Sequence, residues 1–426
     1  MRFSRVAAVC AAALLTGCGD EEKAPASQPD TAQGATAQAP AAETQTPELA
    51  QPAATAQSTP QPAADASTTG PVIEISKAGA NTTDAAAAHP SEADVLYQQA
   101  CESLKSDSED AKKQAVASLT KAAELGHAAA QYKLGSCYRQ GIGTAADLTQ
   151  AVSWFEKAAA ARNPQAQREL AFMYHQGEGV ERDLTKAEQY YSAVTTQNLE
   201  DIESLVLLGF VQAENENRLP EAVATFRKAV EAANPYAQVA LGVLTLQGRG
   251  GLTADAAEAY KLFAAAAEQG VADALCNQGY CLETGTGTAK DEAKAVECYT
   301  KAIAAVPLPQ AKYNLALCYI NGRGVPKDPQ KAMPLLVDAA NAGHPDALCE
   351  LSRCCALGIG VPQDTKQAFD LCIQAAQAGS AEAQYTLARY FQQGEVTEKD
   401  ESFARQCLET AAANGHELAR KEQENK

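Results

Sequence analysis

Apolar and small residues recur at helical spacing from about residue 91 to the end of the chain. Ala130, Leu134 and Tyr138 are four residues apart, which places them on one face of a helix. A Gly-x-Gly pair follows, and Asp147, four residues beyond it, precedes a second helical pattern that contains Trp154 and Phe155. This arrangement predicts two antiparallel helices joined by a glycine loop, with the aspartate capping the second helix.

The helix pair repeats about every 36 residues. Its central position is occupied in turn by Leu134, Leu170, Leu208, Leu241, Gln278, Leu315, Leu351 and Leu387. A glycine follows the central residue in four units (Gly135, Gly209, Gly242, Gly279) and predicts a close approach of the second helix. One helix pair has too little core to fold alone, so the pairs are expected to stack.

This pattern resembles the Sel1-like repeat, a relative of the tetratricopeptide repeat with a glycine-containing loop. The resemblance covers residues 91–426 and implies an all-α fold, a right-handed α-solenoid of about nine stacked helix-turn-helix repeats. The first unit lacks the glycine loop and is predicted to cap the array. The unit with Leu208 also lacks it and has Asn215 and Asn217 at that place.

The first residues have the pattern of an export signal. Arg2 and Arg5 precede an apolar run of about ten residues, too short for a span that needs about 20. Leu15-Thr16-Gly17-Cys18 resembles a bacterial lipobox, which implies that residues 1–17 are removed and that Cys18 carries the lipid. The protein is then expected in the bacterial cell envelope, facing the periplasm, with the lipid as its only membrane contact. The alternative is a secreted protein with a fortuitous cysteine.

Residues 18–90 form a second segment, rich in alanine, proline, glutamine and threonine and nearly free of large apolar residues. Such a segment buries too little surface to offset the entropy of ordering. It is predicted to be a disordered tether between the lipid anchor and the repeats.

Composition excludes several functions. The net charge is −18, so phosphate backbones would repel the chain, and nucleic-acid binding is not expected. Five histidines are scattered, and no Cys-x-x-Cys pair or Gly-x-Ser-x-Gly motif occurs. The sequence therefore predicts no metal, no cofactor and no catalytic site.

The cysteines follow the repeat register. Cys281 and Cys354 come three residues after the central position, whereas Cys298 and Cys372 lie about twenty after it, on the second helix. In an antiparallel pair these positions have similar heights, and an exported chain meets an oxidising compartment. We predict two disulfides within repeats, Cys281–Cys298 and Cys372 with Cys354 or Cys355. The alternative is that these are buried free thiols.

The concave face, formed by the first helices, is the predicted binding surface. The position two residues after the central one is predicted to line this face. It forms an apolar stripe in four units (Phe172, Val243, Tyr280, Leu317) and a basic end in two others (Arg353, Arg389). Asn277 and Asn314 lie one residue before the central position, and their side chains are predicted to form hydrogen bonds with the backbone of a bound peptide. The alternative is that some of these side chains pack between repeats as core.

The resemblance favours a lipid-anchored scaffold that binds a protein or peptide partner, with a regulatory role. A second hypothesis is a cell-wall-related enzyme with penicillin-binding or β-lactamase-like activity, which some cysteine-rich relatives suggest. A third is a self-assembling structural protein. The sequence favours the first because it offers no nucleophile with a base beside it.

Overall fold

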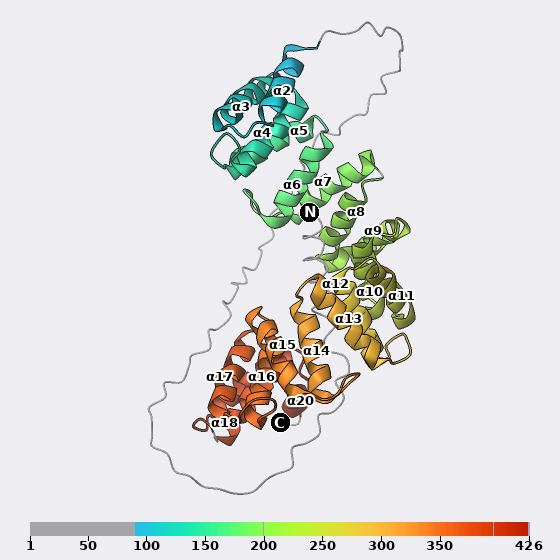
Figure 1. Cartoon of the computed structure of the whole chain (residues 1–426), viewed down its shortest axis with the longest axis vertical. Helices are drawn as coiled ribbons and strands as arrows, with labels where there is room; N and C mark the ends of the chain where they lie inside the picture. The colour runs from blue at the N-terminus through green and yellow to red at the C-terminus, as the bar shows by residue number, and fades with distance from the viewer. Residues whose placement is uncertain (1–89, 199, 395, 425–426) are drawn as a thin grey trace, which may run out of the picture. The chain divides into compact units, whose positions relative to one another are not determined.

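The structure, a computed structural model, describes residues 90–198, 200–394 and 396–424 (Figure 1). Within these ranges the regular structure is helical and no strand occurs. The predicted signal peptide, Cys18 and nearly all of the predicted tether lie outside the described residues. No helix in the described part of the chain has the length and apolarity needed to cross a membrane.

Between residues 90 and 424, where the chain is described, nine helix pairs follow one another and one further helix comes after them. This confirms the all-α fold of about nine units. The first helices are α2 (Glu92–Ser103), α4 (Ala128–Gln140), α6 (Pro164–Gln176), α8 (Ile202–Ala213), α10 (Pro235–Gln247), α12 (Ala272–Thr284), α14 (Pro309–Asn321), α16 (Pro345–Leu357) and α18 (Ala381–Gln393). The second helices are α3 (Glu109–Glu124), α5 (Leu148–Ala160), α7 (Leu184–Gln197), α9 (Leu219–Glu231), α11 (Ala256–Glu268), α13 (Glu292–Ala305), α15 (Pro329–Asn341), α17 (Thr365–Gln377) and α19 (Glu401–Ala413), followed by α20 (Glu417–Glu424).

The predicted caps define the helix ends. Asp147 accepts a hydrogen bond from the backbone N–H of Gln150 at 2.9 Å and begins α5. Six other second helices begin with an aspartate that makes the same bond: Asp183, Asp255, Asp291, Asp328, Asp364 and Asp400. Each such cap contributes about 1 kcal/mol. The unit with Leu208 differs as predicted, because Asn215 and the short 3-10 helix η1 (Glu216–Arg218) replace the glycine loop.

The glycine after the central residue brings the two helices of a unit together, as predicted. A Cβ built on Gly135 would lie 2.7 Å from the Phe155 ring, where no real Cβ fits. Gly209, Gly242 and Gly279 face Phe226, Phe263 and Tyr299 in the same way. These rings are almost fully buried, so the glycines and aromatic residues together form the centre of each unit.

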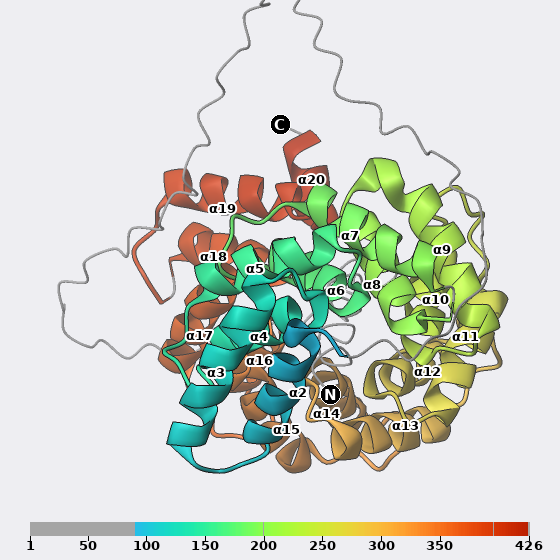
Figure 2. The ribbon, with the colours of Figure 1, turned by 90° about the horizontal axis from the view of Figure 1, so that it is seen from above.

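The helices form two layers. Each second helix packs on the first helix of its own unit and on that of the next. First helices also contact each other directly, α10 with α12, α12 with α14 and α16 with α18, whereas the described second helices show no such contact of comparable extent. In a curved stack, the layer whose members approach more closely is the inner one. Figure 2 shows this order locally, with α11 and α13 outside α10 and α12.

At four junctions, neighbouring units are joined at the start of the helix that follows the junction. His344 caps α16 through Nδ1, its Nε2 lies 2.9 Å from Gln310 Oε1, and its ring stacks on Tyr313 of the preceding unit. His127 pairs with Asp94 and stacks on Tyr97, His416 pairs with Glu382 and stacks on Tyr385, and the Ser380 hydroxyl donates to Asp346. We call this bond between the N-cap side chain and the preceding first helix the junction bond. His127, His344 and His416 are therefore structural.

Candidate functional site

The predicted concave positions fall on the inner layer, but they do not form one continuous apolar stripe. Tyr280 on α12 and Leu317 on α14 are half-buried, and they occupy the same register position on two helices in direct contact. Phe172 is also half-buried, with the guanidinium of Arg139 5.1 Å from its ring centre. The apolar part of the candidate surface is thus centred on α12 and α14.

Val243 is a correction to the predicted stripe. Its exposed fraction is 0%, and it packs with Ala259, Phe263 and Cys281. The close approach of α11 at Gly242 covers this side of α10, so Val243 is core and offers no surface to a partner. The alternative that some stripe residues pack as core holds at this position.

The predicted basic end carries acidic partners. Arg353 is exposed, and its guanidinium binds both carboxylate oxygens of Glu350 on the same helix. Arg389 lies 4.0 Å from Glu422 of α20 and donates to Gln392. The two arginines are on the surface, but Glu350 and Glu422 offset their charge, so this end attracts acidic partners less than the sequence predicted.

The two predicted asparagines differ in their surroundings. Asn314 accepts a hydrogen bond from Gln310 at 3.0 Å and points its amide nitrogen to Cys276 Sγ at 3.8 Å. Asn277 is half-buried, and its Nδ2 is a buried donor with no hydrogen-bond partner in the described structure. An unsatisfied buried donor is uncommon and is destabilising by about 1–3 kcal/mol.

The eleven cysteines in the described part of the chain are free thiols, so neither predicted disulfide is formed in the structure. Cys281 packs with Val243 and Phe263, in a different cluster from Cys298. The Cys298 thiol lies 3.5 Å from Gln278 Oε1, so these two thiols occupy separate environments although their heights are similar.

The thiols of the second predicted disulfide also have other neighbours. Cys372 Sγ lies 3.4 Å from the carbonyl oxygen of Ala383, and Cys355 Sγ lies 3.7 Å from Gln367 Oε1. Cys354 packs in the apolar cluster around Leu351. Burial raises the pKa of Cys354 and of Cys372 to about 12, which makes both poor nucleophiles.

Sequence reasoning missed an acidic residue on the same surface. Asp273 in the first turn of α12 is only 8% exposed, and burial raises the pKa of its carboxyl to about 6. Burial and this carboxylate together raise the pKa of Tyr236 on α10. The signal in the sequence was indirect: Val271 and Leu308 stand at N-cap positions where other units have histidine, serine or asparagine.

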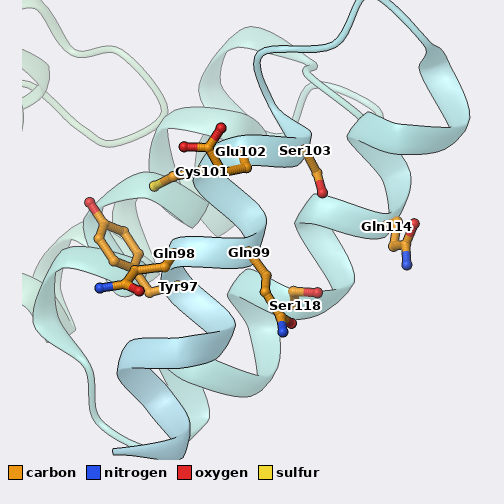
Figure 3. A pocket seen from close by; sticks show the side chains of 8 residues that line it. All are labelled: Tyr97, Gln98, Gln99, Cys101, Glu102, Ser103, Gln114 and Ser118. Carbon is orange, nitrogen blue, oxygen red and sulfur yellow. The ribbon is translucent and has the colours of Figure 1, made fainter. Parts of the chain in front are cut away.

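An open depression of about 780 Å³ lies on the first helix pair (Figure 3). It is lined by Tyr97, Gln98, Gln99, Cys101, Glu102 and Ser103 from α2 and by Gln114 and Ser118 from α3. The lining residues are mostly polar, and they belong to the first helix pair of the described array. A polar outer face is what a terminal repeat needs to stay soluble, which agrees with the predicted capping role.

Comparison with known proteins identifies the repeats. The model of the family described as "Sel1 repeat" matches residues 128–163, 164–193, 235–271, 272–305, 309–344, 345–380 and 381–416, together more than half of the chain. The unmatched interval between 193 and 235 contains α8 and η1, where the glycine loop is missing.

Several relatives share this pattern. An exopolysaccharide production negative regulator of Rhizobium leguminosarum bv. viciae is 27% identical over 157 residues, 34% of this chain and 58% of that protein. The chain thus matches little more than half of this relative. A protective antigen of uropathogenic Escherichia coli with an SLR fold is 26% identical, with a TM-score of 0.49 over 78% of this chain and 79% of that one. A Sel1 repeat protein from Oxalobacter formigenes is 25% identical, with a TM-score of 0.41 over 78% and 86%.

Proposed function

The chain belongs to the Sel1 repeat family, and from this membership we propose that it is a scaffold that binds a protein or peptide partner on its inner layer of helices. Sel1 repeats typically mediate protein binding and are generally not catalytic. The Rhizobium relative is named as a regulator, which supports a regulatory role through the bound partner.

The observation that carries the proposal is the surface of α12 and α14. Tyr280 and Leu317 are half-buried apolar side chains on adjacent helices. The amide nitrogen of Asn277, on the same helix as Tyr280, is buried and has no hydrogen-bond partner in the described structure. We expect this half-buried side chain to turn outward on binding and to donate to a peptide carbonyl. Apolar contact combined with backbone hydrogen bonding is what an extended peptide segment requires.

A photo-crosslinking amino acid at Tyr280 is expected to capture one discrete partner in the native organism, whereas the same group at Glu297 is not. Glu297 is exposed on α13, in the outer layer, and is therefore a matched control. The measurement is the pattern of crosslinked bands, followed by identification of the captured protein.

Three results would contradict the proposal in different ways. Capture at Glu297 alone would move the binding surface to the outer helices. Smears at both positions would leave no evidence of a specific partner. Capture of a second copy of this chain would favour the self-assembling alternative.

We also propose that the chain is anchored in the bacterial envelope by lipid on Cys18, facing the periplasm. The support is the basic start, the short apolar run and the sequence Leu15-Thr16-Gly17-Cys18. Residues 18–90 then provide a tether that keeps the repeats near the membrane. Two or more acyl chains give stable anchoring, since each buried CH₂ contributes about 0.8 kcal/mol.

Labelled palmitate is expected to enter the full-length protein in cells and to be lost in Cys18→Ala, which should leave the membrane fraction. Cys10→Ala is the matched control, because Cys10 lies in the apolar run of the predicted signal. Equal labelling of the Cys18→Ala variant would mean that the lipid is attached elsewhere. Absence of label from the wild type would favour the secreted alternative.

A further inference from the structure

The junction bond between units is interrupted in the middle of the array. It links Asp94 to His127, Gln310 to His344, Asp346 to Ser380 and Glu382 to His416. The acidic or amide partner always stands five residues before the central position of its helix. Asp273 has the same place on α12, but the N-cap residue of the next first helix is Leu308, which makes no side-chain cap bond. The apolar N-cap leaves Asp273 without the partner that the N-cap side chain supplies at these four junctions.

Asp273 stays inside the structure despite this loss. Within the described ranges it forms no ion pair, and its carboxyl accepts a hydrogen bond from its own backbone N–H. The residue is more than nine-tenths buried, with an exposed fraction of 8%. Its position in the first turn of α12 favours a carboxylate slightly, through the helix dipole. That gain is smaller than the penalty for a buried charge, so the dipole alone does not account for this residue.

A second unsatisfied group lies one helical turn away. Asn277 follows Asp273 by four residues, so both side chains lie on one face of α12. Its Nδ2 is buried and has no partner, although Asn314, the equivalent residue on α14, is engaged. A carboxylate without a cationic partner and an amide donor without an acceptor therefore stand side by side on the inner layer, where α12 contacts both α10 and α14.

We propose that Asp273 and Asn277 form a binding site for a basic residue of the partner peptide, with the carboxylate of Asp273 pairing with a lysine or arginine side chain and Asn277 donating to a neighbouring peptide carbonyl. The inference rests on the proposed function and names the chemical class of the partner. Charge complementarity supports it, because the chain carries a net charge of −18 and Asp273 is a carboxylate without a cation. A charge-assisted hydrogen bond in such a site is strong and is made only with a cationic partner.

The neighbourhood of the site fits an extended segment. Tyr280 lies seven residues after Asp273 and three after Asn277, on the same side of α12. Leu317 has the equivalent place on α14. A peptide that runs along α12 would meet the acidic site first and the apolar side chains next. The expected motif is a basic residue with an apolar residue a few positions away.

The test is selection of phage-displayed nonapeptides on the immobilised full chain, followed by binding measurements with synthetic peptides. The enriched peptides are expected to share a lysine or arginine at one position. Replacing that residue by acetyl-lysine should weaken binding to the wild type at least tenfold. The same replacement should weaken binding to the Asp273→Asn variant less than twofold. Asp346→Asn is the matched control, because Asp346 has the same register but is engaged by Ser380, and it should keep the tenfold discrimination.

The outcomes separate the inference from the proposed function. The proposed site would be wrong if the enriched peptides share no basic residue. It would also be wrong if Asp273→Asn still binds the lysine peptide at least tenfold more tightly than the acetyl-lysine peptide. In both cases the scaffold proposal stands. Selection that yields no peptide, together with no capture at Tyr280, would overturn both. Circular dichroism melting of Asp273→Asn and Asp346→Asn verifies that the variants are folded when they are compared.

Discussion

Replacing Gly287 with alanine is expected to lower the free energy of unfolding by about 3–5 kcal/mol, which places it among the most damaging single substitutions. Gly287 lies in the loop between α12 and α13 with φ of +70°. An added Cβ would stand 1.9 Å from the carbonyl oxygen of Ala256, at the start of α11 in the preceding unit. The clash is with backbone, so no side-chain rotation relieves it, and the two units must separate.

The matched control is Gly343→Ala. Gly343 also has a positive φ, +86°, but no atom lies within 4 Å of an added Cβ. Only the left-handed backbone conformation is penalised there, by about 1–2 kcal/mol. Urea unfolding followed by circular dichroism measures both losses. Because repeat arrays unfold in parts, amide hydrogen exchange of α11 to α13 should show the larger loss locally. Equal losses in the two variants would contradict the packing role of Gly287.

The periodic features of the fold could be predicted because each repeats the same local physics. An aspartate four residues after the glycine loop finds the free N–H groups of the next helix regardless of the unit, so Asp147 and Asp400 form the same cap. Gly135 could be assigned to a close approach because an aromatic residue follows at a fixed distance, and Phe155 fills that place. Such features depend on neighbours within one unit.

The binding surface was predicted less well because it depends on cover by the following unit and on ion pairs with nearby residues, neither of which the repeat period determines. Val243 and Tyr280 share one register position, yet one is fully buried and the other half-exposed. The difference arises because Cys281, from the following unit, packs against Val243 together with Phe263. Arg353 was predicted as free positive charge, but Glu350 one turn earlier on its own helix binds it. A period predicts which face a residue occupies, but it does not predict how much of that face the next unit covers.

Asp273 was missed for a related reason. A repeat pattern draws attention to residues that recur, whereas this site results from residues that fail to recur at two N-cap positions, Val271 and Leu308. The sequence contains this signal, but it becomes visible only once the junction bonds of the other units define the expected partner.

Replacing Asp273 with asparagine is expected to stabilise the protein at neutral pH by about 3 kcal/mol and to have little effect near pH 4. In the folded chain the pKa of this carboxyl is about 6, because burial disfavours the charged form. In the unfolded chain an aspartate has a pKa of about 3.9. Between these values the folded state holds a proton that the unfolded state has released, so the free energy of unfolding falls as the pH rises from about 4 to about 6.

The difference of about two pKa units corresponds to about 3 kcal/mol, which the wild type has lost above pH 6. Asparagine has nearly the same shape but no charge, so the free energy of unfolding of the variant does not fall in this way as the pH rises. Urea unfolding of both proteins at about pH 4 and at about pH 7.5 gives the measurement, and the difference between the two proteins removes the effect of all other titrating groups. A stability difference that does not change with pH would mean that the carboxyl titrates as in the unfolded chain.

The same experiment connects stability to binding. A buried charge without a partner is destabilising unless a ligand supplies the opposite charge, and residues that weaken a fold in this way are concentrated at functional sites. A selected peptide with a lysine at the shared position should therefore stabilise the wild type more strongly at pH 7.5 than at pH 4, where Asp273 is protonated. The peptide should stabilise the Asp273→Asn variant less than the wild type, and by the same amount at pH 4 and pH 7.5. If the peptide stabilises both proteins equally at every pH, the lysine does not meet Asp273.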